Sequence, residues 1–361
     1  MEKDVNKKSK LWQISFFKGV AMLMIVLCHA SQKFDIPTAF HVIPSFCQMG
    51  CQIFFALSAF SLCLSMDRKN DSVRAFYKRR FFSIAPGYWL AVITYVCFAL
   101  ITERTGEGNF LHINISLDNI GANIGLVHGL IPTEANNKVV KGGWYVGTLV
   151  LLYLLFPLLR NLYRMFEKRI NDFAIILVVQ ITSFLLLSLI YFFYPSLSLA
   201  NNKFLYFSFV NQLPSFCVGI LLYNIFKKNK FNDVKYPLVK SVLIGLVALL
   251  LFFSHFHHSF VFEPLVFTSA FAYLFIYSLQ LKVFKYNTLS RIILKYGENS
   301  YAIYLIHPLI LYTGAYLLNT YYHTGLLIYM AWIPLSFVVV YYFGMLYNSI
   351  ISKVQTLFSR E

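Results

Sequence analysis

The sequence has 361 residues, of which 58% are hydrophobic and only 13% are charged. A soluble domain has about 25% charged residues, so this composition excludes an ordinary soluble globular protein. The formal net charge of +16 would suit nucleic-acid binding if Lys and Arg gathered on one folded soluble face, but here they lie between apolar runs. We therefore expect no nucleic-acid partner.

Apolar runs of about 20 residues recur along the chain, and each is long enough to cross about 30 Å of hydrocarbon as a helix. We predict an all-α integral membrane protein with about ten transmembrane helices, forming a single membrane-embedded domain over residues 1–361. The predicted runs are 11–30, 43–66, 81–101, 143–159, 173–194, 204–226, 237–254, 264–281, 297–318 and 325–350.

Lys and Arg are distributed unevenly between the two sides of these runs. Alternate connections and the two tails, 1–10 and 352–361, hold 25 basic residues, and the other connections hold 5. Basic residues accumulate in short cytoplasmic loops, so both termini are predicted to be cytoplasmic and the long connection 102–142 to lie outside. No small-residue cleavage site follows the first run, which we expect to be retained. Residues 117–131 are apolar enough for a short helix against the membrane.

Two groups of residues could suggest a metal site. Cys47 and Cys51 are one helical turn apart and would serve either as a redox or metal pair or as two small packing residues; we favour packing. His255, His257 and His258 crowd a short outer loop, but no further ligand is placed by spacing to complete a site, so we favour an interfacial loop. We predict no metal and no permanently bound cofactor.

Ionisable side chains inside apolar runs are costly, so catalysis is to be sought there. The first run carries Lys18 and His29, eleven residues apart. That spacing puts both on one helix face, about 16 Å apart along the axis. His29 is a candidate general base because neutral imidazole can take a proton from a hydroxyl. The alternative is that His29 forms an interfacial hydrogen bond and Lys18 extends its amine toward the cytoplasm.

A second polar stripe lies in the ninth run, where Ser300, Tyr304 and His307 follow one another at spacings of four and three. Such a stripe must face protein or a water-filled cavity. It is a candidate acceptor site, and the alternative is hydrogen bonding between helices.

Two further pairs lie near the ends of runs. Arg79 and Arg80 precede the third run and are either ordinary cytoplasmic cations or a clamp for the phosphates of a soluble cofactor. Trp144 and Tyr145 begin the fourth run at the outer surface. They fit an interfacial aromatic belt, although stacking on a sugar ring would use the same residues.

Five segments of the sequence form recognisable motifs: FFKGVAMLMIVLCHA (16–30), FFALSAF (54–60), YKRRFFSIAPGYW (77–89), GGWYVGTLVLLYLLFPLL (142–159) and YGENSYAIYLIHPLI (296–310). In this order they resemble motifs of the acyltransferase 3 family, bacterial membrane enzymes that acylate sugars of envelope polymers. The resemblance covers essentially the whole chain, and the last segment is its most specific match. The resemblance of the first segment implies that His29 is the catalytic histidine.

The sequence departs from the family pattern at four positions. Lys18 stands where the family usually has Arg. The positive charge is kept, but the planar guanidinium that can make two parallel hydrogen bonds is lost. Ala59 replaces a Gly, and Ser83 occupies the place of the second arginine of a pair whose first member is Arg80. Leu149 stands where many members have Glu, so no role of that acid is transferred.

The resemblance implies an O-acyltransferase in a bacterial cytoplasmic membrane. It would carry an acyl group, most often acetyl, from cytoplasmic acyl-CoA to a hydroxyl of a cell-envelope or exported glycan or lipid-linked oligosaccharide. In this interpretation His29 and Lys18 are catalytic, Arg79 and Arg80 bind the coenzyme, and the acceptor-site candidates are Trp144, Tyr145, Ser300, Tyr304 and His307.

Other membrane functions remain open from the residues alone. A transporter or flippase for a glycan or lipid-linked sugar would show symmetric halves with helices broken at corresponding positions, and no such symmetry is found. A glycan polymerase would present cations in a long outer loop, where Arg104 is the only arginine. A receptor or structural protein would tolerate replacement of His29.

Overall fold

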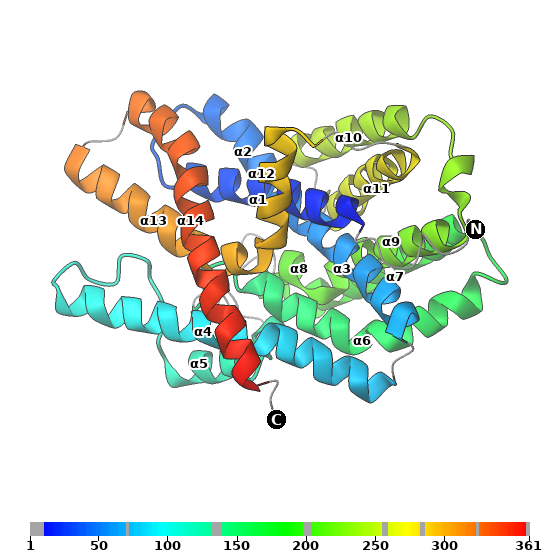
Figure 1. Ribbon diagram of the computed structural model, residues 1–361, viewed down its shortest axis with the longest axis horizontal. Helices are drawn as coiled ribbons and strands as arrows, with labels where there is room; N and C mark the ends of the chain where they lie inside the picture. The colour runs from blue at the N-terminus through cyan, green and yellow to red at the C-terminus, as the bar shows by residue number, and fades with distance from the viewer. Residues whose placement is uncertain are drawn as a thin grey trace.

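The computed structural model describes residues 11–69, 72–131, 139–197, 204–254, 259–281, 286–322 and 325–358. The tail 1–10, the last residues 359–361 and the loop histidines His255, His257 and His258 lie outside this part of the chain. Within it, every regular element is a helix (Figure 1).

The longer helices form the body of the molecule. They are α1 (Trp12–Ser31), α3 (Gly50–Lys69), α4 (Val73–Arg104), α6 (Trp144–Phe166), α7 (Asp172–Phe193), α9 (Phe209–Lys227), α10 (Pro237–Ser254), α11 (Ser259–Gln280), α12 (Thr288–Glu298), α13 (Ser300–Tyr322) and α14 (Leu326–Phe358). Shorter helical segments connect them: η1 (Thr38–His41), α2 (Val42–Phe46), η2 (Cys47–Met49), α5 (Leu117–Ile124), η3 (His128–Leu130), η5 (Pro195–Leu197), α8 (Phe204–Phe207) and η6 (Lys230–Asp233).

Ten helical segments of the described residues are long and apolar enough to cross a membrane, which confirms the predicted fold class. The second segment is a composite that runs from η1 to the end of α3. The third, α4, begins at Val73, eight residues before the predicted run, because the Ser72 side chain accepts a hydrogen bond from the Ala75 amide and caps the helix.

One helix was not predicted. α12 lies just before α13 and starts with a capping box, in which Asn287 and Ser290 each bind the other's backbone amide. It packs against α1 so closely that a Cβ at Gly297 would collide with the Ser15 carbonyl. Its polar face gave it too little hydropathy to be predicted as a membrane span.

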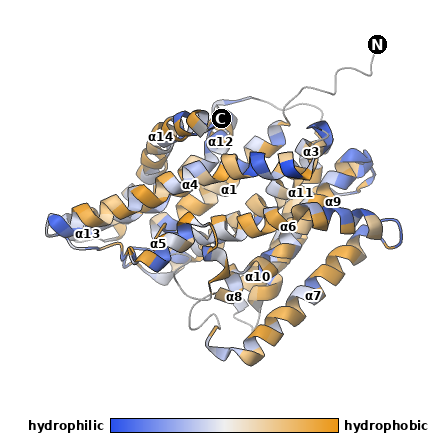
Figure 2. Ribbon diagram, turned by 90° about the horizontal axis from the view of Figure 1, so that it is seen from below, coloured by the Kyte–Doolittle hydropathy of each residue, from blue (hydrophilic) through white to orange (hydrophobic). Residues whose placement is uncertain are grey.

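The core of the bundle is formed by α3 and α9. In the membrane-spanning segments that contain α3 and α9, 78% and 72% of the residues in the apolar 18-residue stretch are buried inside the protein. The corresponding fractions are 17% in α10 and 22% in α14. A Cβ at Gly219 would meet the Ala56 carbonyl, so glycine allows α3 and α9 to approach closely. The outer helices expose many large apolar side chains. The ribbon of α7 is accordingly coloured as hydrophobic along most of its length (Figure 2).

α1 and α13 lie side by side, and both contact α14. The Tyr95 hydroxyl of α4 accepts a hydrogen bond from the Leu309 amide of α13, and the Tyr301 hydroxyl of α13 donates to the Ile84 carbonyl of α4. These two hydrogen bonds join α13 to α4, while α13 also packs against α1.

The long connection after α4 contains the predicted short helix as α5, followed by η3. The Trp89 indole donates to the Ile124 carbonyl, and the Tyr88 hydroxyl donates to Asn123 Oδ1 at 2.6 Å. His128 is fully buried and its Nε2 donates to the Gly143 carbonyl at 3.0 Å. The connection is therefore held against the start of α6.

Candidate active site

Two histidines that are 278 residues apart in sequence meet between α1 and α13. The ring centroids of His29 and His307 lie 5.1 Å apart. His307 is fully buried, and His29, in the last turns of α1, is partly exposed. The structure thus brings together the histidines of the first and the last family motif.

The neighbours of His29 determine which ring nitrogen carries its proton. Nδ1 lies 2.8 Å from the Tyr312 hydroxyl and 3.0 Å from Gln32 Oε1. The Tyr312 hydroxyl donates its own proton to Gln32 Oε1 at 2.7 Å, so both oxygens are left as acceptors for an Nδ1 proton. Neutral His29 then carries its lone pair on Nε2, the form required of a general base.

The neighbours of His307 fix its tautomer in a different way. Pro308 has no amide hydrogen, so the Tyr304 carbonyl four residues earlier lacks its usual helical donor. His307 Nδ1 lies 2.8 Å from that carbonyl and 3.2 Å from the Ile303 carbonyl, and donates there. Nε2 of His307 is therefore a buried acceptor, and no hydrogen-bond partner for it is present among the described residues.

Aromatic rings enclose the two histidines on the α6 side. The Tyr304 ring lies 5.4 Å from His307 and 5.0 Å from Tyr145, measured between centroids. Tyr145 also contacts Phe55 of α3 at 4.7 Å. The Tyr304 hydroxyl donates to the Gly142 carbonyl at 2.8 Å, which fixes the end of the long connection beside the site.

From Tyr145 a line of polar side chains continues toward the opposite end of the bundle. Both Tyr145 and Tyr153 of α6 interact with the Ser58 side chain of α3. The Arg80 guanidinium acts electrostatically on Tyr153 and lies 3.5 Å from Ser65 Oγ. Polar side chains of α3 and α6 therefore lie between Arg80 and the histidine pair.

The remaining predicted site residues lie away from the histidine pair. Lys18 is half-buried on the part of α1 that packs against α12, about 16 Å from His29 along the helix. Ser300 is buried two turns before His307. Trp144 stacks on Phe207 at 4.4 Å and is a packing residue of the bundle.

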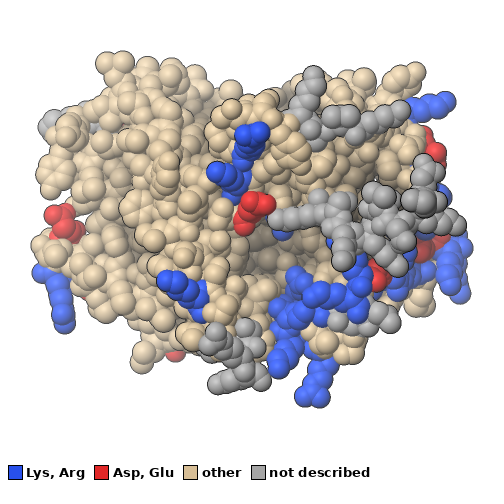
Figure 3. Space-filling model, in the orientation of Figure 1, with Lys and Arg blue, Asp and Glu red and all other residues tan. Residues whose placement is uncertain are grey.

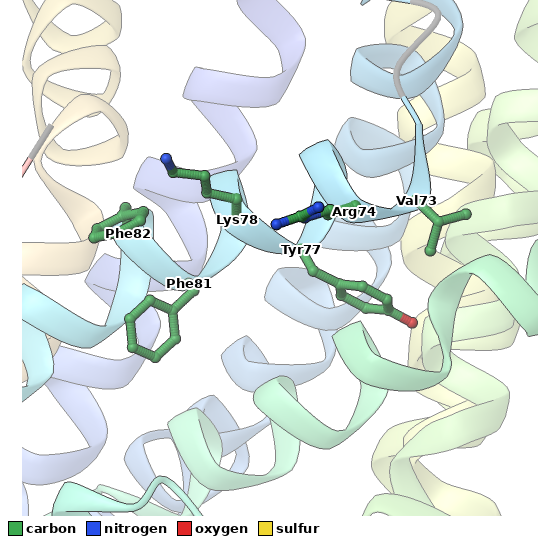
Figure 4. A pocket seen from close by; sticks show the side chains of 6 residues that line it. All are labelled: Val73, Arg74, Tyr77, Lys78, Phe81 and Phe82. Atoms are coloured by element: carbon green, nitrogen blue, oxygen red, sulfur yellow. The ribbon is translucent and has the colours of Figure 1, made fainter. Parts of the chain in front are cut away.

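The Asp67 end of the bundle, where α3 and α6 terminate and α4 begins, is rich in cations. Arg79 is half-buried there, in the first turns of α4. In Figure 3 the visible Lys and Arg side chains are densest at the lower right, near the end of α3 and the start of α4. A shallow groove follows the outside of α4, and Figure 4 shows Arg74 and Lys78 on it beside Phe81 and Phe82. Neither Arg79 nor Arg80 lines this groove.

Sequence reasoning missed four residues of the site. Gln32 and Tyr312 lie just outside the family motifs that contain His29 and His307, and only the pairing of α1 with α13 joins them. Ser58 and Tyr153 lie within two of the quoted motifs but had no partner to identify them. Among the described residues, no group of three or more His, Cys, Asp or Glu is arranged to hold a metal ion, and Cys47 and Cys51 are buried free thiols.

The arrangement is suited to group transfer. His29, a histidine with a defined tautomer, lies at the partly exposed end of the line of polar side chains, and cations lie at the other end. A family model described as an acyltransferase domain, that of the acyltransferase 3 family, matches residues 11–352. Comparisons with curated proteins and with solved structures give no match. Because the family match spans nearly the whole chain and its helices form a multi-pass membrane bundle, the protein belongs to the acyltransferase 3 family of membrane acyltransferases.

Proposed function

We propose that the protein is an O-acyltransferase that moves an acyl group, with acetyl as the first candidate, from cytoplasmic acyl-CoA to a hydroxyl of a cell-envelope or exported glycan. The observation that carries the proposal is the His29–His307 pair at the end of a polar line that starts at Arg80. The family implies a bacterial cytoplasmic membrane, and the excess of basic residues on one side supports an orientation with both termini in the cytoplasm.

The proposed reaction uses the lone pair on His29 Nε2. His29 takes the proton of the acceptor hydroxyl as its oxygen attacks the thioester carbonyl carbon. The carbon–oxygen bond forms, the carbon–sulfur bond breaks, and the proton on His29 passes to the departing sulfur of the coenzyme. Tyr312 and Gln32 hold the Nδ1 proton in place, so that Nε2 stays available to the hydroxyl.

The other residues divide between donor and acceptor. We assign the phosphates of the donor to Arg80, with Arg79 beside it, and the neutral arm to the line of Ser58, Tyr153 and Tyr145, whose electrostatic contacts support this path. Lys18 lies too far along α1 for the reacting atoms, and we assign it to orienting the donor. Tyr304 and His307 border the acceptor position next to His29.

The test is mass spectrometry of surface glycans from cells that carry the intact gene, a deletion or His29→Ala. We expect an acyl mass to be lost in the deletion and restored by the intact gene. His29→Ala should lower the acylation rate by about 10²–10⁴-fold, the contribution of a positioned general base. His112→Ala, which removes an exposed histidine elsewhere, is the matched control and should acylate normally at equal membrane abundance.

Unchanged acylation in the deletion strain would overturn the proposed function and favour a transport role. Labelled acetyl-CoA supplied to inverted membrane vesicles tests the donor separately. Label should appear in the glycan with the intact protein and be absent with His29→Ala.

A further inference from the structure

A cluster of ions lies at the Asp67 end of the bundle and takes no part in the reaction described above. Asp67, near the end of α3, accepts from Arg160 and, at 3.3 Å, from Arg164 of α6. Lys227 and the Tyr223 hydroxyl, both of α9, donate to its other oxygen at 2.6 Å each. One carboxylate thus faces three cations and joins three helices.

A second ion pair lies beside it. Lys228 donates to Glu167 Oε2 at 2.6 Å, and Asn224 donates to the same oxygen at 3.3 Å. With Asp67, Arg160, Arg164 and Lys227, the two groups contain four cations and two carboxylates, which leaves a net charge of +2.

The four cations and Glu167 line a pocket of about 220 Å³, and Asp67 lies behind its wall, paired with three of the cations. Cys63 and Ile220 form its apolar part. Arg164, Lys227 and Lys228 are about half exposed, at 46%, 54% and 43%, whereas Arg160 is 9% exposed. Arg160 is therefore bound to Asp67, whereas the other three cations have further N–H groups that face the pocket and solvent.

An anion in this pocket would offset the surplus positive charge. Arg and Lys together suit a phosphate, because the guanidinium fork and the ammonium both donate charge-assisted hydrogen bonds to its oxygens. The two carboxylates hold the cations in place, and some N–H groups of the cations stay available to bind an anion.

The place of the pocket relative to Arg80 identifies the kind of phosphate. Tyr153, Arg160 and Arg164 lie on one face of α6 at spacings of seven and four. Arg80 lies 3.5 Å from Ser65 Oγ, two residues before Asp67 on α3, and acts on Tyr153, seven residues before Arg160 on α6, so Arg80 lies between the pocket and the histidines. From the Asp67 end toward the histidines, the cations of the pocket come first, Arg80 follows, and the neutral polar side chains of α3 and α6 come last.

We propose that this pocket binds the terminal phosphomonoester of the donor's nucleotide, and that Arg80 faces the phosphates nearer the thioester arm. The inference rests on the proposed function, because it assigns part of the acyl-CoA site. A phosphomonoester dianion matches a surplus of two positive charges, and the order of charges from the pocket to Ser58 matches a molecule with a charged nucleotide end and a neutral arm.

The test measures binding of CoA and of dephospho-CoA, which lacks that phosphate, to the full-length protein in nanodiscs of neutral phosphatidylcholine. The intact protein should bind CoA at least about tenfold more tightly, the effect of one or two charge-assisted hydrogen bonds. The double variant Arg164→Gln with Lys228→Gln keeps the Asp67–Arg160 pair, so it should fold. It should bind both ligands with the affinity that the intact protein has for dephospho-CoA.

The matched control is Lys69→Gln with Arg169→Gln, which removes two exposed charges that do not line the pocket and should keep the tenfold preference. Equal binding of the two ligands by the intact protein would overturn the assignment and leave acyl-CoA as donor. Absence of any CoA binding together with absence of acyl transfer would overturn the proposed function as well. A preference that disappears in phosphatidylglycerol nanodiscs would instead assign the pocket to a lipid phosphate.

Discussion

The His29 end and the Asp67 end of the bundle both bury polar groups, but with different chemistry. At the His29 end the polar groups are imidazoles, phenols and an amide, paired with one another and with backbone carbonyls. At the Asp67 end they are ions, paired across three helices and partly open to water. A general base must be neutral to take a proton from a hydroxyl, whereas a phosphate is held by charge-assisted hydrogen bonds from cations.

The difference also separates stability from catalysis. Each group at the His29 end is neutral, so removing one leaves a single unpaired hydrogen-bonding group. Removing Asp67 leaves several like charges facing one another. We therefore expect the Asp67 end to control the stability of the bundle and the His29 end to control the rate.

Asp67→Ala should give the largest effect on stability. Arg160 is almost completely buried and would lose its carboxylate, and Arg164 and Lys227 would repel it. We expect the free energy of unfolding to fall by about 3 kcal/mol, the lower range for breaking a buried ion pair, because the other cations are half exposed. Thermal unfolding in detergent measures this.

The control for Asp67 is Asp233→Ala, which removes an exposed carboxylate in η6 and should change the unfolding temperature little. If Asp67→Ala and Asp233→Ala unfold at the same temperature, the Asp67 cluster does not stabilise the bundle, and the contrast between its two ends is wrong.

Tyr312→Phe should act on the rate with a smaller effect. The change removes one hydrogen bond to His29 Nδ1 and one to Gln32, while Gln32 still accepts the Nδ1 proton. A hydrogen bond contributes about 1 kcal/mol, so kcat should fall about fivefold while KM for the donor stays unchanged. Steady-state transfer kinetics in vesicles measure both.

Tyr316→Phe is the control, because the Tyr316 hydroxyl donates to the exposed Glu107 and not to the site. A rise in KM at constant kcat for Tyr312→Phe would show that Tyr312 binds substrate and does not position His29.

The helices could be predicted from sequence because hydropathy and length identify a membrane span without knowledge of its neighbours. His29, Tyr304 and His307 could be singled out because a polar group in an apolar run is costly wherever the run packs. Asp67 and Arg160 could not, because near the ends of runs they look like ordinary loop charges and only the packing of α3, α6 and α9 joins them. α12 was missed because its packing against α1 rests on glycines and not on hydropathy.

His128 extends the comparison to the long connection, where a neutral histidine serves structure. Burial lowers the pKa of His128 to about 4, although its hydrogen bond to the Gly143 carbonyl opposes this. The unfolded chain, with an ordinary pKa near 6.5, binds the proton more readily than the folded one, so stability rises with pH. The contribution of neutral His128 is complete above pH 6.5 and is lost as the pH falls toward 4.

The loss of folding free energy caused by His128 is expected to be the smallest effect of the series, below about 1 kcal/mol between pH 7 and pH 6. It grows as the pH falls further. His128→Gln keeps a donor for the Gly143 carbonyl but does not titrate, so its unfolding temperature should fall less steeply between pH 6.5 and 4 than that of the intact protein. Proteolysis of the 102–142 connection over the same pH range locates the change. Cleavage that increases equally in both proteins would mean that acid opens this connection through other groups, and that the pairing of His128 with Gly143 does not hold it against α6.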